Sequence, residues 1–143
     1  MKKQKIETTK APSAVGPYSQ AVTMGNMLFC SGQIGVDPKT NALVSGGVEA
    51  QTQQVFTNIN AILKKAGIGF EQVAKVNVYL QSMDDYIVMN DLYKEYFNEP
   101  FPARATVEVA KLPKQALIEI DLIAYLKNSD GCCGGGGECC GKT

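Results

Sequence analysis

The order of apolar patterns along the chain limits its fold more than any other feature. Residues 21–24 and 27–33 are two short strand-like runs separated by Gly25-Asn26, a pair typical of a hairpin turn. A helical pattern, a strand pattern, a second helical pattern and two further strand patterns follow up to residue 126. The sequence therefore predicts an α+β domain with a mixed β-sheet and two helices.

Two segments carry the helical patterns. The first covers about residues 48–66, where apolar residues recur at steps of three and four, and Gly67 stands where many helices end. The second begins near residues 83–85, whose acidic side chains suit a positive helix N-terminus. Its helical face is formed by Tyr86, Met89, Asn90, Tyr93, Tyr96 and Phe97. Pro100 and Pro102 then end it.

Three later segments, residues 73–80, 105–110 and 117–126, alternate apolar and polar side chains as half-buried strands do. Residues 36–47 carry turn chemistry and predict a surface loop. Two helices most simply cover one face of such a sheet. The other face then remains to be buried, which favours packing against copies of the chain in a closed oligomer.

Charge and hydropathy exclude several classes of partner. Fourteen cationic and fourteen anionic residues cancel, and the lysines are scattered, so nucleic acid is not an expected partner. No apolar run reaches the length of a membrane span, and the polar stretch Met1 to Lys10 precedes no apolar signal core, so we expect a cytoplasmic protein. Histidine is absent, which removes the commonest general base and metal ligand.

Cysteines gather at the end of the chain. We interpret residues 1–127 as one domain and residues 128–143 as a glycine- and cysteine-rich tail that is expected to be unfolded. Thiolates for a thiophilic metal could come from Cys132, Cys133, Cys139 and Cys140, but their adjacent pairs differ from a C-x-x-C arrangement. The alternative is an inert appendage. Cys30, alone in a strand, is expected to be a buried small hydrophobe.

Arg104 is the single arginine among the fourteen cationic residues, which suggests a position where an ammonium group would not serve. A guanidinium binds a carboxylate through two parallel hydrogen bonds, whereas lysine is a mobile point charge. Thr106 lies two residues on and shares its strand face. If the strand that begins at Leu117 runs antiparallel beside the strand of Arg104, Glu119 faces Arg104 and Thr106. The group predicts an anion site with a water-orienting base; the alternative is paired charges that stabilise a sheet.

Several separated motifs occur in one order along residues 5–126. They are Gly16-Pro17-Tyr18-Ser19-Gln20-Ala21, Ser31-Gly32-Gln33, Phe101-Pro102-Ala103-Arg104, Val107-Glu108-Val109-Ala110-Lys111-Leu112-Pro113 and Ile118-Glu119-Ile120. Taken singly, the first two are equally well explained by turn formation and core filling. Together the motifs resemble the RidA (YjgF-type) family of enamine/imine deaminases.

This resemblance implies a chorismate-mutase-like fold and a homotrimer whose sheets surround a central barrel, with active clefts between subunits. It also implies hydrolysis of 2-imino acids, chiefly 2-iminobutanoate and 2-iminopropanoate, to 2-oxo acids and ammonia, without a metal or organic cofactor. Members of the family have also been described as translation inhibitors, ribonucleases and holdases. A trimeric binding protein or holdase without catalysis is therefore the alternative; neutral charge and the lack of histidine weigh against a ribonuclease.

The resemblance also implies roles for single residues. Arg104 binds the substrate carboxylate, and Glu119 and Thr106 hold the attacking water. The rest of the cleft wall is formed by Tyr18, Ser31, Gly32 and Asn90, with Tyr18 and the Ser31-Gly32 loop facing Arg104 across the interface between two subunits. Some members have cysteine at position 106, so their thiol-specific properties are in doubt here, although a threonine hydroxyl can still hold water.

Overall fold

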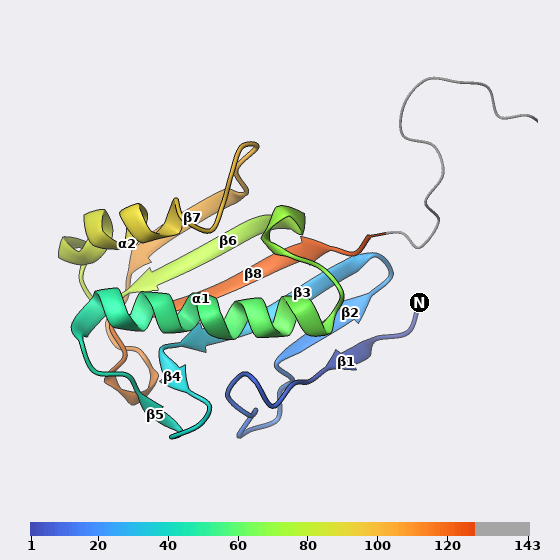
Figure 1. Cartoon of the computed structure of the whole chain (residues 1–143), viewed down its shortest axis with the longest axis horizontal. Coiled ribbons are helices and arrows are strands. Elements are labelled where there is room, and N and C mark those ends of the chain that lie inside the picture. Colours follow the sequence, from blue (N-terminus) through green and yellow to red (C-terminus); the bar gives the residue numbers. More distant parts are fainter. Residues whose placement is uncertain (128–143) are drawn as a thin grey trace, which may run out of the picture.

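A mixed six-stranded sheet forms the centre of the computed structural model, which describes residues 1–127 (Figure 1). Its strands lie in the order β1-β2-β3-β8-β6-β7. They are β1 (Gln4–Ile6), β2 (Ala21–Met24), β3 (Met27–Ile34), β6 (Val73–Leu80), β7 (Ala103–Glu108) and β8 (Ile118–Tyr125). Strands β6 and β7 run parallel, and the other neighbouring strands run antiparallel. The predicted surface loop contains a small hairpin of β4 (Val36–Asp37) and β5 (Ala42–Leu43).

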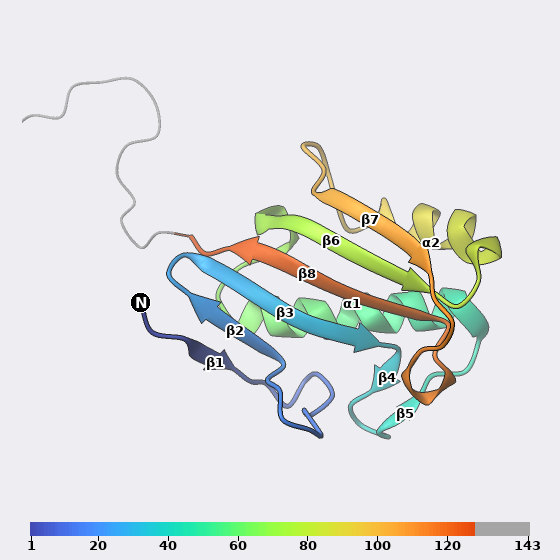
Figure 2. The ribbon, with the colours of Figure 1, turned by 180° about the vertical axis from the view of Figure 1, so that it is seen from behind.

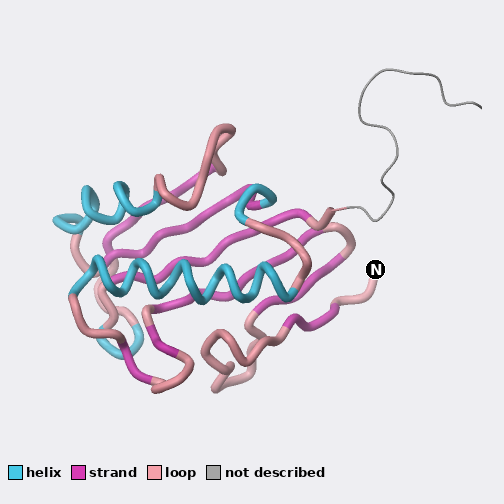
Figure 3. Tube along the Cα trace, viewed as in Figure 1, coloured by secondary structure: helices cyan, strands magenta, loops and turns pink. Residues whose placement is uncertain are grey.

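Both helices, α1 (Gly47–Lys65) and α2 (Tyr86–Tyr93), lie on the same face of the sheet, as predicted (Figures 1 and 3). Gly67, with φ of +79°, follows α1 in the left-handed conformation expected of a glycine after a helix. Helix α2 ends earlier than its apolar pattern suggests, because Glu95 and Tyr96 donate to carbonyls three residues back and form tight turns. Within residues 1–127, short 3₁₀ turns lie at Phe70–Gln72, Met83–Asp85 and Pro113–Gln115.

The hydrophobic core lies between α1 and the sheet. The inner face of α1 contributes the fully buried side chains of Val55, Phe56, Ile59, Ile62 and Leu63. They pack against side chains of β3, β6 and β8, among them Leu28, Val76, Val78, Ile118, Ile120 and Leu122. Cys30 belongs to this core, and burial raises the pKa of its thiol to about 12, so it is the small hydrophobe that the sequence predicts.

The opposite face of the sheet is covered by no helix of residues 1–127 (Figure 2). Large apolar side chains are 43–47% exposed on the strands: Met24, Phe29, Val107 and Tyr125. Between them, Asp121 accepts hydrogen bonds of 2.8 Å from Asn77 Nδ2 and from the Tyr79 hydroxyl. An uncovered face was expected, because two helices cover only one side of the sheet. The burial of this face against other copies of the chain stays a prediction. None of the described helices is both long and apolar enough to cross a membrane.

The predicted pairing of the strand that carries Arg104 with the strand that carries Glu119 is wrong. Strand β6 lies between β7 and β8, with Val76 opposite Arg104, Val78 opposite Thr106 and Tyr79 opposite Glu119. Neighbours across a ladder share a face, so Arg104 and Thr106 lie on the helix-covered face and Glu119 lies on the open one. The α2 crossover places β7 parallel to β6 at the sheet edge, and β8 then pairs with the other side of β6.

Candidate active site

Arg104 is held by helix α2 through three side chains. Its Nη1 donates to Asn90 Oδ1 at 2.9 Å, and its Nη2 donates to the Tyr86 hydroxyl at 3.0 Å. The guanidinium carbon lies 4.6 Å from the centre of the Tyr93 ring, a distance suited to a cation–π contact. These residues, with Thr106, form what we call the arginine half-site.

The charge of Arg104 is not neutralised by a carboxylate of the described chain. None of the ion pairs among residues 1–127 includes it, and its hydrogen-bond partners are neutral oxygens. Three of its five N–H donors stay available after those two hydrogen bonds. The hydroxyl of Thr106 is buried and has no hydrogen-bond partner within residues 1–127. The half-site therefore offers a fixed cation to a ligand, and Thr106 adds a buried, unpaired hydroxyl on the same strand face.

The second group of predicted residues lies around Glu119 on the open side of the sheet. A cavity of about 380 Å³ is lined by Tyr18, Ser31, Gly32, Ile34, Pro113 and Glu119, and we call this the glutamate half-site. The ladder between β3 and β8 shifts register between Cys30 and Gln33, so a bulge falls at Ser31 and Gly32. The Ser31 hydroxyl donates to the Ser19 carbonyl at 2.6 Å and so ties the bulge to the segment that carries Tyr18.

Glycine at position 32 is required by the close approach of Glu119. A Cβ added there would lie 2.9 Å from Glu119 Cδ and would overlap Oε1. We therefore expect Gly32→Ala to displace the carboxylate, which can swing away, and to leave the backbone in place. The free energy of unfolding should change by less than about 1 kcal/mol. The kcat of a reaction that depends on this carboxylate should fall about tenfold.

Thermal unfolding and steady-state kinetics of the Gly32→Ala variant check this expectation. A variant with unchanged kcat would show that the position of the Glu119 carboxylate is unimportant. Ser31→Ala separates a loosened bulge from a displaced carboxylate, because it removes the hydrogen bond to the Ser19 carbonyl without adding a side chain that would overlap Glu119.

Glu119 has an electrostatic environment that favours its protonated form. Burial raises the pKa of the Glu119 carboxyl, and the negative charge of Asp121, two residues along the same strand face, raises it further. The Tyr79 hydroxyl donates to Asp121 instead of Glu119, and this hydrogen bond is the main reason for the raised pKa of Tyr79. A carboxyl group with a pKa closer to neutrality is suited to proton transfer.

Comparison with known proteins gives a consistent result. Residues 8–126 match a family model described as Endoribonuclease L-PSP, which groups the YjgF and RidA proteins. The chain is 54% identical over 123 residues to a RutC family protein of Pyrococcus horikoshii, covering 86% of this chain and 98% of that protein. The chain belongs to the RidA family.

Two further members of the RidA family resemble the chain closely. A 2-iminobutanoate/2-iminopropanoate deaminase of Bos taurus is 50% identical over 119 residues, covering 83% of this chain and 87% of that protein. The crystal structure of RidA from an Antarctic Psychrobacter superposes with a TM-score of 0.83 at 49% identity, covering 86% of this chain and 99% of that one. The likeness therefore extends over sequence and fold.

Within one subunit of this RidA-family protein, the predicted site residues form two groups and not one. Arg104, Thr106 and Asn90 lie in the arginine half-site, and the glutamate half-site contains Tyr18, Ser31, Gly32 and Glu119. Sequence reasoning missed the contacts of Tyr86 and Tyr93 with Arg104. Their spacing with Asn90 on one helical face was the available signal, but the same spacing also predicts a core face.

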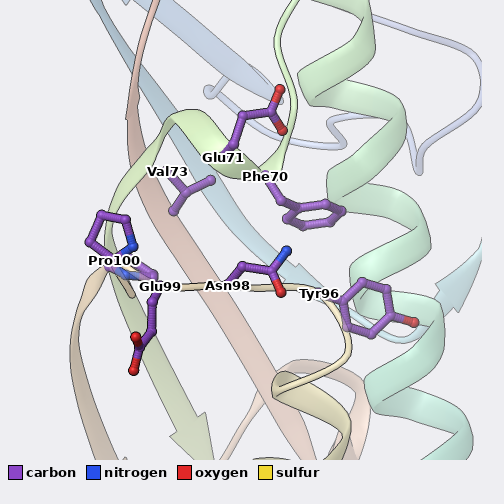
Figure 4. Close-up of a pocket in the computed structure, with 8 residues that line it drawn as sticks. Phe70, Glu71, Val73, Tyr96, Asn98, Glu99 and Pro100 are labelled. Carbon is purple, nitrogen blue, oxygen red and sulfur yellow. The ribbon is translucent and has the colours of Figure 1, made fainter.

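Another cavity, of about 150 Å³, lies at the turn before β6 and the segment before β7 (Figure 4). Its walls include Phe70, Tyr96 and Asn98, and the carboxylates of Glu71 and Glu99 point to opposite sides of it (Figure 4). Among residues 1–127 no group of three or more potential ligands could hold a metal ion. The tail cysteines considered as metal ligands lie outside the described residues.

Proposed function

We propose that this protein hydrolyses 2-imino acids, with 2-iminobutanoate and 2-iminopropanoate as substrates, to 2-oxo acids and ammonia. The observation that carries the proposal is Arg104, a guanidinium fixed by neutral partners and paired with no carboxylate of the described chain. A planar cation of this kind suits the carboxylate that every 2-imino acid carries. The activity named for the cattle relative, at 50% identity, supports the same substrate class.

The reaction needs a bound imine, a water molecule and one base. Arg104 holds the substrate carboxylate, and Thr106 and Glu119 position the water. As the water oxygen bonds to the carbon of the protonated imine, the Glu119 carboxylate accepts a proton from it. Glu119 then returns this proton to the nitrogen. As the C–N bond breaks and the carbonyl forms, the Glu119 carboxylate accepts the remaining hydroxyl proton and passes it to the departing ammonia, so that the products are a 2-oxo acid and ammonium. The proposal uses no metal and no organic cofactor.

A complete site needs a second copy of the chain, because the two half-sites lie on opposite faces of the sheet. We therefore propose a homotrimer in which the open sheet faces surround a central barrel. The exposed apolar side chains of that face support its burial against neighbouring copies. In this arrangement the glutamate half-site of one subunit faces Arg104 of the next subunit. The half-site contributes Tyr18, Ser31, Gly32 and Glu119.

Mixing two impaired variants tests whether the site is shared between subunits. Arg104→Lys subunits keep Glu119, and Glu119→Gln subunits keep Arg104, so a cleft between one of each can be complete. In a closed ring of three that contains both variants, one of the three clefts combines both intact residues, so purified mixed trimers should regain about a third of the wild-type kcat per cleft. Co-expression of differently tagged variants, purification of mixed trimers and measurement of kcat per cleft give the result.

The same preparations provide the control. Each variant mixed only with itself should keep only its own low residual activity. If mixed trimers are no more active than the pure variants, both residues act within one subunit, and sedimentation of an active monomer would contradict the trimer itself.

The rival function is a holdase or binding trimer without catalysis, and the exposed apolar face gives it a specific basis. An amino-acid oxidase that produces 2-iminobutanoate in situ separates the two functions. The proposed deaminase should accelerate release of 2-oxobutanoate, and Arg104→Lys should abolish most of this effect. A holdase should suppress aggregation of an unfolded client equally well with and without that substitution.

A further inference from the structure

We propose that Tyr86 is a positioning residue that fixes the plane of the Arg104 guanidinium for carboxylate binding. The inference rests on the proposed function and assigns a role to a side chain outside the motifs that define the site. It concerns the phenolic oxygen of Tyr86, which accepts a hydrogen bond of 3.0 Å from Arg104 Nη2.

Two hydrogen bonds hold the guanidinium at both terminal nitrogens. Asn90 Oδ1 binds Nη1 and Tyr86 binds Nη2, and these two residues are four apart on the same face of α2. A planar group held at two separate nitrogens cannot rotate freely about its long axis. The Tyr93 ring lies 4.6 Å from the guanidinium carbon and limits its movement in a third direction.

The backbone around Tyr86 is tied to the strand that carries Arg104. The Met83 amide donates to Glu108 Oε2 at 3.2 Å, and Glu108 is the last residue of β7. Ser82 accepts from the Asp84 amide through its hydroxyl and caps the turn that leads into α2. The first residue of α2 is Tyr86, so its distance from Arg104 is set by contacts that exist before a ligand binds.

A neutral acceptor suits this position better than a carboxylate would. The phenol of Tyr86 and the amide of Asn90 orient the guanidinium without cancelling its charge, which stays available to an incoming anion. Their two hydrogen bonds also leave three N–H donors, enough for a bidentate carboxylate. Tyr86 therefore acts through Arg104 and needs no contact with the substrate.

Tyr86→Phe tests the role, because it removes the acceptor and keeps the ring. We expect KM for 2-iminobutanoate, and Kd for the product 2-oxobutanoate measured by calorimetry, to rise about three- to tenfold. The change in kcat should be smaller, within about threefold, because the charge of Arg104 remains. Tyr96→Phe is the matched control: its ring follows α2, Arg104 donates no hydrogen bond to it, and wild-type constants are expected.

The same substitution in an Arg104→Lys background separates positioning from general structural damage. With the guanidinium absent, Tyr86→Phe should change Kd by less than about twofold. An equal effect in both backgrounds, or tighter binding by Tyr86→Phe alone, would overturn the proposal. If Arg104→Lys itself binds 2-oxobutanoate and turns over imine as the wild type does, the proposed function fails first, and this result is distinguishable from a failure confined to Tyr86.

Discussion

Replacing Arg104 by lysine is expected to lower kcat/KM for 2-iminobutanoate by roughly 10- to 150-fold while the protein stays folded. This range corresponds to the loss of one charge-assisted hydrogen bond, worth about 1.5 to 3 kcal/mol. A lysine ammonium keeps the charge but makes one mobile contact where the guanidinium makes two in a fixed plane. It also cannot keep the contacts with both Asn90 and Tyr86 that hold the group in place.

The separate kinetic constants show what the arginine contributes. If it stabilised the ground and transition states equally, KM alone would rise and saturating substrate would restore the rate. In the proposed mechanism Arg104 also aligns the imine carbon with the water, so we expect kcat to fall as well. Circular dichroism and sedimentation should match the wild type. Lys94→Arg, at an exposed position just after α2, exchanges the same two residue types and should leave both constants unchanged.

A folded Arg104→Lys protein that turns over 2-iminobutanoate at nearly the wild-type rate would contradict the central assignment of the site. Activity lost together with the fold would instead assign Arg104 a structural role. The three contacts that α2 makes with the guanidinium make this second measurement necessary.

The two helices and the longer strands were predictable because each has a local signal, whereas the short strands β1, β4 and β5 were not predicted. The periodicity of α1, the glycine after it and the alternation of β6 and β8 all depend on neighbouring residues. The pairing of β7 was not predictable in this way. The turn between β7 and β8 suggests that these two strands form a hairpin. However, β6 has two edges at which a strand can pair: the crossover through α2 brings β7 to one edge, and β8 pairs with the other. The choice between these two pairings depends on contacts between residues that are far apart in the sequence.

The error in strand order had a direct consequence for the site. Placing β6 between β7 and β8 moves Glu119 to the face opposite Arg104, although the identities of both residues were predicted. The closeness of Gly32 to Glu119 could not be predicted either, because it depends on the bulge in β3. Residue types therefore indicated the chemistry, and the sheet register separates the predicted residues into two half-sites on opposite faces.

Glu119→Gln is expected to lower kcat by roughly tenfold to a thousandfold with KM little changed, since the substitution keeps the shape of the side chain and removes the proposed base. The pH profile gives a second measurement. Glu119 must be ionised to accept a proton from water, so kcat/KM should fall as the pH drops through its pKa. Burial and the charge of Asp121 raise that pKa, which places this acidic limb above the usual range for a glutamate.

The glutamine variant should lack the acidic limb, because no carboxyl titrates at position 119. Asp121→Asn is the matched control, since it removes one negative charge from the same strand face. It should keep most of the turnover and move the acidic limb to lower pH, because Glu119 then ionises beside one anion fewer. A Glu119→Gln protein as fast as the wild type, with the acidic limb intact, would mean that Thr106 and the backbone position the water and that another group titrates.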